Sequence, residues 1–183
     1  MRPTRTKDRV RALLAAGTVL GLGAVGTLAA WTDSSTATSG TFSTGTIDLW
    51  LGSGTTDPNP FSFTTFATSN MAPGSATTAT LQVNNSGTLP FTYNVSGSAT
   101  NSGAGSDQLG SALTLQIYAG TTCSGTVLNS PATFTFSALG TTRTLAAGTN
   151  ETLCFRAALP TGADTALQGK STVGTFVFTA TNT

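Results

Sequence analysis

The sequence predicts an all-β protein, an antiparallel β-sandwich of jelly-roll type that follows a cleaved N-terminal signal peptide. Two observations lead to this prediction. A basic stretch and a long uncharged, apolar segment open the chain. After them, apolar and polar residues alternate repeatedly between turn residues, and no amphipathic helical pattern appears. Period-two alternation rich in Thr, Val, Ile and Phe is typical of antiparallel strands with one wet face, and such sheets stack as sandwiches.

The opening residues have the parts of a secretory signal peptide. Five of the eight Lys and Arg residues lie within residues 2–11, residues 12–30 carry no charge, and small residues precede Trp31. We expect cleavage after Ala29, with cleavage after Ala30 as the alternative. A retained membrane anchor is the competing interpretation, because about 20 apolar residues span a bilayer. The glycines of this segment make it a poor packed helix, which favours removal.

Removal of residues 1–29 leaves residues 30–183, a length that suits one domain with an N-terminal extension over residues 30–40. Only 8% of the whole chain is charged, and most of its bases lie in the signal segment. The mature part therefore has no basic patch for nucleic acid, and we expect no membrane contact once the signal is removed. A surface with so few charges repels its own copies weakly, which favours self-association.

Alternation predicts eight or nine short strands in the mature chain. The clearest lie at residues 80–83, 91–95, 113–117, 133–136, 153–157 and 174–180, and earlier strands are expected at 41–51 and 61–67. Residues 52–60 and 96–110 read as long polar loops. The expected core consists of the inward-facing apolar residues, namely Phe42, Ile47, Leu49, Phe61, Phe63, Leu81, Val83, Phe91, Tyr93, Leu115, Ile117, Phe155, Phe176 and Phe178.

Two cysteines, Cys123 and Cys154, remain after export. An even count in an exported chain favours one disulfide, and two buried thiols are the alternative. A bridge that closes a loop of about thirty residues adds about 3 kcal/mol or slightly more to stability in the chain-entropy model.

The sequence offers no catalytic site. It contains no histidine, which disfavours both a zinc peptidase site and a Ser-His-Asp mechanism. Its few acids are scattered and form no glycosidase-like pair. We therefore expect a protein that is not an enzyme and that has no cofactor, no metal ligands and no catalytic residues.

Two stretches near the N-terminus resemble one family of exported bacterial surface proteins. Residues 26–33 are similar to the signal-peptide exit that a SipW-type signal peptidase processes. Residues 41–49 resemble the first mature strand of the TasA, CalY and camelysin group, in which a phenylalanine is followed by a glycine and an aspartate-leucine pair. Residues 71–75 and 81–87 are similar to the proline-glycine turn and next strand of that group. The cysteine pair and the Thr/Ser/Gly-rich loops look more like an actinobacterial branch.

The resemblance implies an exported structural protein, a jelly-roll subunit of extracellular fibres in a biofilm matrix. In such fibres the N-terminal stretch of one subunit completes the sheet of its neighbour by strand addition. The candidate donor spans residues 30–49 and includes Trp31, Thr32, Asp33, Phe42, Ile47 and Leu49. A disordered leader is the alternative interpretation of its first part.

Two other functions stay open. The first is a monomeric surface module, an adhesin or a carbohydrate-binding protein, with matrix polysaccharide as a possible partner. The second is a camelysin-like metallopeptidase, which the absence of histidine disfavours. Trp31 and Trp50 suit an intersubunit contact, where tryptophan is enriched, or simple packing against the domain's own sheet.

Overall fold

The computed structural model describes residues 5–25, 34–54 and 56–182. The chain divides into two compact units, Met1–Phe42 and Ser43–Thr183. In the first unit, helix α1 (Arg5–Val25) covers the basic stretch and much of the apolar segment. No helix among the described residues is long and apolar enough to cross a membrane.

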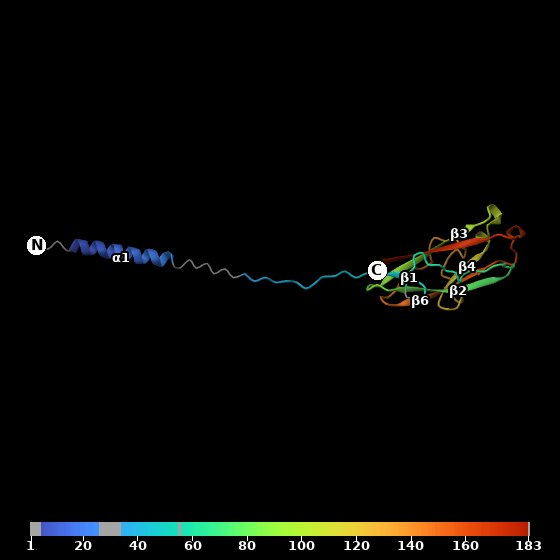
Figure 1. The fold of residues 1–183 in the computed structure, drawn as a ribbon, viewed down its shortest axis with the longest axis horizontal. Coiled ribbons are helices and arrows are strands. Elements are labelled where there is room, and N and C mark those ends of the chain that lie inside the picture. The colour runs from blue at the N-terminus through green and yellow to red at the C-terminus, as the bar shows by residue number, and fades with distance from the viewer. Residues whose placement is uncertain (1–4, 26–33, 55, 183) are drawn as a thin grey trace. The chain divides into compact units, whose positions relative to one another are not determined.

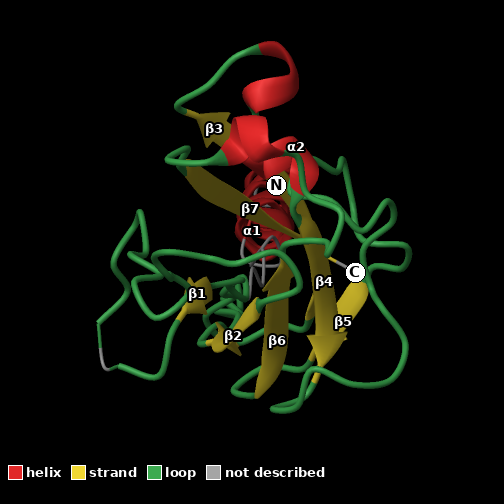
Figure 2. Ribbon diagram, turned by 90° about the vertical axis from the view of Figure 1, so that its right-hand side faces the viewer, coloured by secondary structure: helices red, strands yellow, loops and turns green. Residues whose placement is uncertain are grey.

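The second unit is a β-sandwich, which confirms the predicted all-β class (Figure 1). Sheet A has the strand order β1 (Leu49–Leu51), β2 (Ala76–Asn85), β6 (Asn150–Ala158), β4 (Thr114–Ala119). Sheet B has the order β5 (Arg143–Leu145), β3 (Phe91–Asn101), β7 (Thr172–Asn182). Helix α2 (Leu109–Ala112) and the 3₁₀ turns η1 (Gly105–Asp107) and η2 (Thr165–Leu167) lie in the connections. Every strand pair is antiparallel, and Figure 2 shows β2, β6 and β4 side by side.

The long strands follow the predicted alternation. In sheet A, Leu81 lies opposite Leu153 and Ile117 lies opposite Phe155, and all four side chains are buried between the sheets. Of the expected core, seven residues are buried, namely Leu81, Val83, Phe91, Tyr93, Leu115, Ile117 and Phe155. Five more are partly buried and pack against these, namely Leu49, Phe61, Phe63, Phe176 and Phe178.

The strand predicted at residues 41–51 is much shorter than expected. Only Leu49–Leu51 forms a strand, and the prediction that Phe42 is a core residue is wrong, because its side chain is 90% exposed. Ile47 is also outside the core at 40% exposure. Phe42 ends the first unit, and regular pairing starts only where the chain reaches the edge of β2.

The strand predicted at residues 61–67 is wrong. The chain turns there, since the amide of Phe66 donates to the carbonyl of Phe63 at 3.1 Å. The phenylalanines still point inward, with the ring of Phe63 edge-on to that of Phe155 at 5.3 Å between centroids. Aromatic burial alone produced the alternation that resembles a strand.

The strand predicted at residues 133–136 is also wrong, because this stretch makes only isolated bridges. Thr133 bridges to β4 in sheet A, whereas Phe136 bridges to Gly97 in sheet B. The stretch therefore passes from one sheet to the other and cannot continue along either.

The long polar loop predicted at residues 96–110 is too long. Its first part, up to Asn101, continues β3, because the register with β7 runs unbroken from Phe91 to Asn101. The remainder holds η1 and α2. The described residues of the predicted loop at 52–60 form no helix or strand, in agreement with the prediction, whereas strand β5 is not predicted by the sequence.

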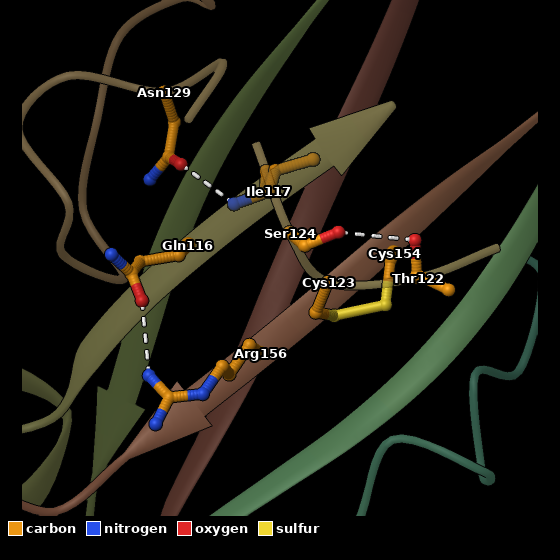
Figure 3. The surroundings of a disulfide bond; sticks show 8 residues. All are labelled: Gln116, Ile117, Thr122, Cys123, Ser124, Asn129, Cys154 and Arg156. Carbon is orange, nitrogen blue, oxygen red and sulfur yellow. Dashed lines mark hydrogen bonds between the residues drawn. A yellow bond between two sulfur atoms is a disulfide. The ribbon is translucent and has the colours of Figure 1, made fainter. Parts of the chain in front are cut away.

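Cys123 and Cys154 form a disulfide (Figure 3). The bridge ties the loop after β4 to the middle of β6, with 5.1 Å between the Cα atoms. On the same face of sheet A, Arg156 Nη1 donates to Gln116 Oε1 at 3.0 Å (Figure 3). The disulfide thus ties the loop after β4 to β6, and the contact between Arg156 and Gln116 ties β6 to β4.

Candidate functional site

The edges of the two sheets are the candidate site, because strand addition needs an edge whose N–H and C=O groups are unpaired. The two sheets present four edges. Sheet A ends at β1 and β4, and sheet B ends at β5 and β7. The neighbours of each edge decide whether it can receive another strand.

The β4 edge is closed by Asn129, which is 3% exposed. Its side-chain oxygen accepts the amide of Ile117 at 2.9 Å, and its side-chain nitrogen donates to the carbonyl of Leu115 at 2.9 Å. The amide of Leu128 also donates to the carbonyl of Ile117 at 2.8 Å. The Asn129 side chain thus forms the hydrogen bonds that a neighbouring strand would form. The amide of Ile117 and the carbonyl of Leu115 are therefore not available to an incoming strand.

The same loop also pairs with β3 of sheet B, beyond the three residues that pair with β5. Gly97 of β3 exchanges two backbone hydrogen bonds with Phe136, at 3.0 and 3.1 Å. The amide of Leu139 donates to Asn94 Oδ1 at 2.7 Å. Residues 128–139 therefore contact both sheets on this side of the sandwich, at β4 in sheet A and at residues 94–97 of β3 in sheet B.

The opposite side of the sandwich is formed by the β1–β2 edge and by β7. Strand β1 pairs only with Val83–Asn85, and the amide of Gly52 then donates to the carbonyl of Gln82 at 2.8 Å. Within the described residues, nothing pairs with this side of residues 76–81 of β2.

Strand β7 is the longest unpaired edge. All eleven of its residues pair with β3, and no described segment pairs with its other side. Because Gly97 directs its N–H and C=O toward Phe136, its partner Phe176 is in a non-hydrogen-bonded pair of the β3–β7 ladder. The N–H and C=O of Phe176 therefore point to the open side, as do those of Gly174, Phe178 and Ala180.

This edge lacks the usual protection against pairing. Proteins blunt exposed edges with Lys, Pro, bulges or very short strands. Thr172–Asn182 contains no Lys, no Pro and no other charged residue, and its register is regular. The charged residue nearest to the start of the strand is Lys170, whose Nζ forms an ion pair with Asp107 Oδ2 at 3.1 Å. This contact lowers the pKa of the Asp107 carboxyl.

The predicted donor residues fall into three groups. Trp31, Thr32 and Asp33 lie outside the described residues, as does the expected cleavage site at Ala29 and Ala30. Phe42 is exposed and lies in the first unit. Ile47 and Leu49 already belong to the sandwich domain, because Leu49 pairs with Asn85 of β2 and the carbonyl of Asp48 accepts the amide of Ser86.

Gly45 packs against the sandwich domain. The next residue, Thr46, accepts the amides of Thr88 and Leu89 at 2.9 and 3.0 Å. A Cβ atom on Gly45 would lie 2.8 Å from either Cδ atom of Leu89. Because the compact sandwich unit begins at Ser43, the candidate donor ends at Phe42 and is shorter than the predicted stretch of residues 30–49.

Polar groups inside the sandwich hold the sheets together. Tyr93 of β3 donates to Glu151 Oε1 of β6 at 2.7 Å, and Arg143 of β5 forms an ion pair with the same carboxylate. Burial, followed by this hydrogen bond, raises the pKa of Tyr93. The hydrogen bond to Glu151 raises the pKa of Arg143. No described cluster of three or more His, Cys, Asp or Glu residues exists to hold a metal.

A shallow hollow lies beside β1, lined by Asp48, Trp50, Thr56, Asp57 and Ser86. Its volume is about 180 Å³, below the range of about 300–1,000 Å³ for ligand pockets. Trp50 Nε1 donates to Ser86 Oγ, so this tryptophan packs against its own domain.

Comparisons with known proteins give no family for this chain. No protein-family model matches the sequence, and no curated protein matches it either. The resemblance to the TasA, CalY and camelysin group therefore stays a prediction from its motifs.

Proposed function

We propose that this protein is an exported structural protein of the cell surface, a TasA-like subunit that forms extracellular matrix fibres by strand addition. The acceptor is the open edge of β7. The donor is the segment of residues 30–42 from a neighbouring copy. The unprotected eleven-residue edge of β7 carries this proposal, because an edge of that kind binds an extended chain through its main-chain groups.

The donor and the acceptor match in length. Eleven residues in a strand span about 36 Å, and the donor is slightly longer than the acceptor. Residues 30–42 contain no proline and a single charge, at Asp33. Residues 34–42 form no helix or strand, so they have backbone groups to offer to a neighbour.

The added strand would also complete the architecture. Among the described residues, sheet A has four strands and sheet B has three. A strand next to β7 would give two sheets of four, which is the strand number of a jelly roll.

Export is supported by two features of the chain. The basic and apolar segments before residue 30 match a secretory signal peptide. The Cys123–Cys154 disulfide suits an oxidising compartment outside the cytoplasm.

Electron microscopy of two purified forms tests the proposal. One form begins at Ala30, and the other begins at Ser43, where the compact sandwich starts. We expect filaments from the first form and monomers from the second. Filaments from both forms would remove residues 30–42 as the donor, and monomers from both at high concentration would contradict the fibre function.

The hollow beside Trp50 favours the alternative function, a carbohydrate-binding module. An indole face with two carboxylates, Asp48 and Asp57, is a pattern that can hold a sugar ring and its hydroxyls. Its small volume makes this the secondary candidate. Saturable binding of a soluble saccharide that Trp50→Ala abolishes would support it.

A further inference from the structure

The outer face of sheet B is an uncharged array of hydroxyl and valine side chains. We define the hydroxyl face as the residues of β3 and β7 that point away from the core, namely Thr92, Ser96, Ser98 and Thr100 with Val173, Thr175, Val177, Thr179 and Thr181. Asn94 lies on the same side, but its side chain accepts the amide of Leu139. The face is regular, because β3 and β7 pair without a break.

Two exposed valines lie on this face. Val173 is 66% exposed and Val177 is 53% exposed. Apart from Ile47, they are the exposed large hydrophobic residues among the described part of the sandwich. Valine side chains and threonine methyl groups make the face partly apolar, and exposed apolar patches often mark contact surfaces.

We infer that the hydroxyl face packs against the same face of a second copy of this chain. No residue of the face is charged, so two copies meet without repulsion, and a charged partner would find no counter-charge there. Each hydroxyl both donates and accepts hydrogen bonds. The hydroxyls of a second hydroxyl face can therefore form hydrogen bonds with those of the first. Within one copy, the hydroxyls of Thr92 and Thr181 already form such a bond, at 3.0 Å between the oxygens.

The geometry suits a two-fold pair. Stacked sheets lie about 10 Å apart with their side chains interdigitated. A two-fold axis brings the same residue of both copies together near its centre. Val177 is the sixth of the eleven residues of β7, so an axis that crosses the middle of β7 sets β7 of one copy against β7 of the other and brings the two copies of Val177 together.

The size of the face sets the strength of the contact. Two strands about 36 Å long and about 10 Å wide in total present about 350 Å² per copy. A stable pair buries about 800 Å² per partner, so an isolated pair is weak and forms only at high protein concentration. Repetition along a fibre would strengthen it without any new contact. The pairing itself does not need the proposed fibres, because strand addition uses the backbone edge of β7 and not its outer side chains.

Sedimentation velocity of residues 43–183 over a wide concentration range tests the inference, because this unit has its own core and lacks the proposed donor. We expect the sedimentation coefficient to rise with concentration. Val177→Lys should shift the association to at least tenfold higher concentration. Thr80→Lys, at an exposed position on sheet A, is the matched control and should associate like the parent.

A mixture of charged variants makes the test specific for self-pairing. Val177→Lys and Val177→Glu should each associate only at such a higher concentration when alone, and their equimolar mixture should associate at the concentration of the parent, because the two side chains meet at the axis. A parent that stays monomeric at every concentration, or a Val177→Lys variant that associates like the parent, would overturn the inference. So would a monomeric parent that pellets with insoluble cellulose or chitin through Val177, since the face would then bind polysaccharide.

Discussion

Tyr93 and Glu151 join the two sheets of the sandwich through a 2.7 Å hydrogen bond from the Tyr93 hydroxyl to Glu151 Oε1. Tyr93 is 1% exposed. The carboxylate of Glu151 is compensated by Arg143, whose Nη2 pairs with Oε2. A buried hydroxyl and a partly buried ion pair thus share one carboxylate, and neither sheet can slide without breaking both contacts.

Glu151→Gln should destabilise the domain by about 1–3 kcal/mol, because it removes the charge that pairs with Arg143 and weakens the bond from Tyr93. Urea unfolding of residues 43–183 measures the change. Asp57→Asn removes the same charge from an exposed side chain and should change stability by less than about 0.5 kcal/mol. Equal effects of the two variants would contradict the role of the contact between the sheets.

The buried Tyr93 predicts a loss of stability at alkaline pH. Its pKa in the folded state is raised by burial and by Glu151, whereas the unfolded chain loses the proton at about pH 10. Above that pH the folded state binds more protons than the unfolded state, so stability falls by up to about 1.4 kcal/mol per pH unit. Tyr93→Phe should remove this slope, as urea midpoints above and below pH 10 would show. An unchanged slope in the variant would disprove the assignment.

Gly97 should tolerate no side chain. A Cβ atom there would lie 2.7 Å from the carbonyl oxygen of Phe134 and would also contact the ring of Phe136. Gly97→Ala should therefore cost about 1–3 kcal/mol through overpacking. Gly162→Ala is the control, because a Cβ atom at Gly162 has no neighbour within 4 Å. Thermal unfolding compares them, and equal melting temperatures would argue against the close packing.

Reduction of the disulfide should weaken the domain. The sequence separation of 31 between Cys123 and Cys154 gives a loss of about 3–4 kcal/mol in the chain-entropy model. The double variant Cys123→Ser, Cys154→Ser should unfold at lower urea concentration than the oxidised parent, and a reductant should have no further effect on it. A parent whose midpoint does not respond to reductant would refute this estimate.

Alternation predicted the central strands because their side chains face a single core. The inward-facing residues of the pairs Leu81–Leu153 and Ile117–Phe155 are recognisable from the period-two alternation in the sequence. The second half of β3 was missed because its Ser, Gly, Ala and Thr residues have little apolar signal. Pairing with β7 holds this half extended, and such pairing is a tertiary effect.

The state of the edges could not be predicted from sequence. Asn129 reads as an ordinary turn residue, and its role depends on the distant carbonyl of Leu115 and amide of Ile117. An edge strand and a central strand can share the same alternation, so the pattern of β7 does not reveal that it lacks a second neighbour. The disulfide partners were predictable because two cysteines allow one pairing.

The open amides of β7 provide the most direct test of strand addition. Ala180 directs its N–H to the open side, so Ala180→Pro removes one main-chain donor from the edge and spares the ladder to β3. Ala147→Pro is the matched control. Ala147 precedes Gly148 (φ 68°) in a turn closed by the bond from the Thr149 amide to the Ala146 carbonyl, a position where proline is favoured.

Electron microscopy of both proline variants, each beginning at Ala30, is the decisive measurement, with thermal unfolding to verify that each variant is folded. The account predicts filaments from Ala147→Pro and none, or far fewer, from a folded Ala180→Pro. Filaments of the same number and length from both variants would contradict the assignment of β7 as the acceptor.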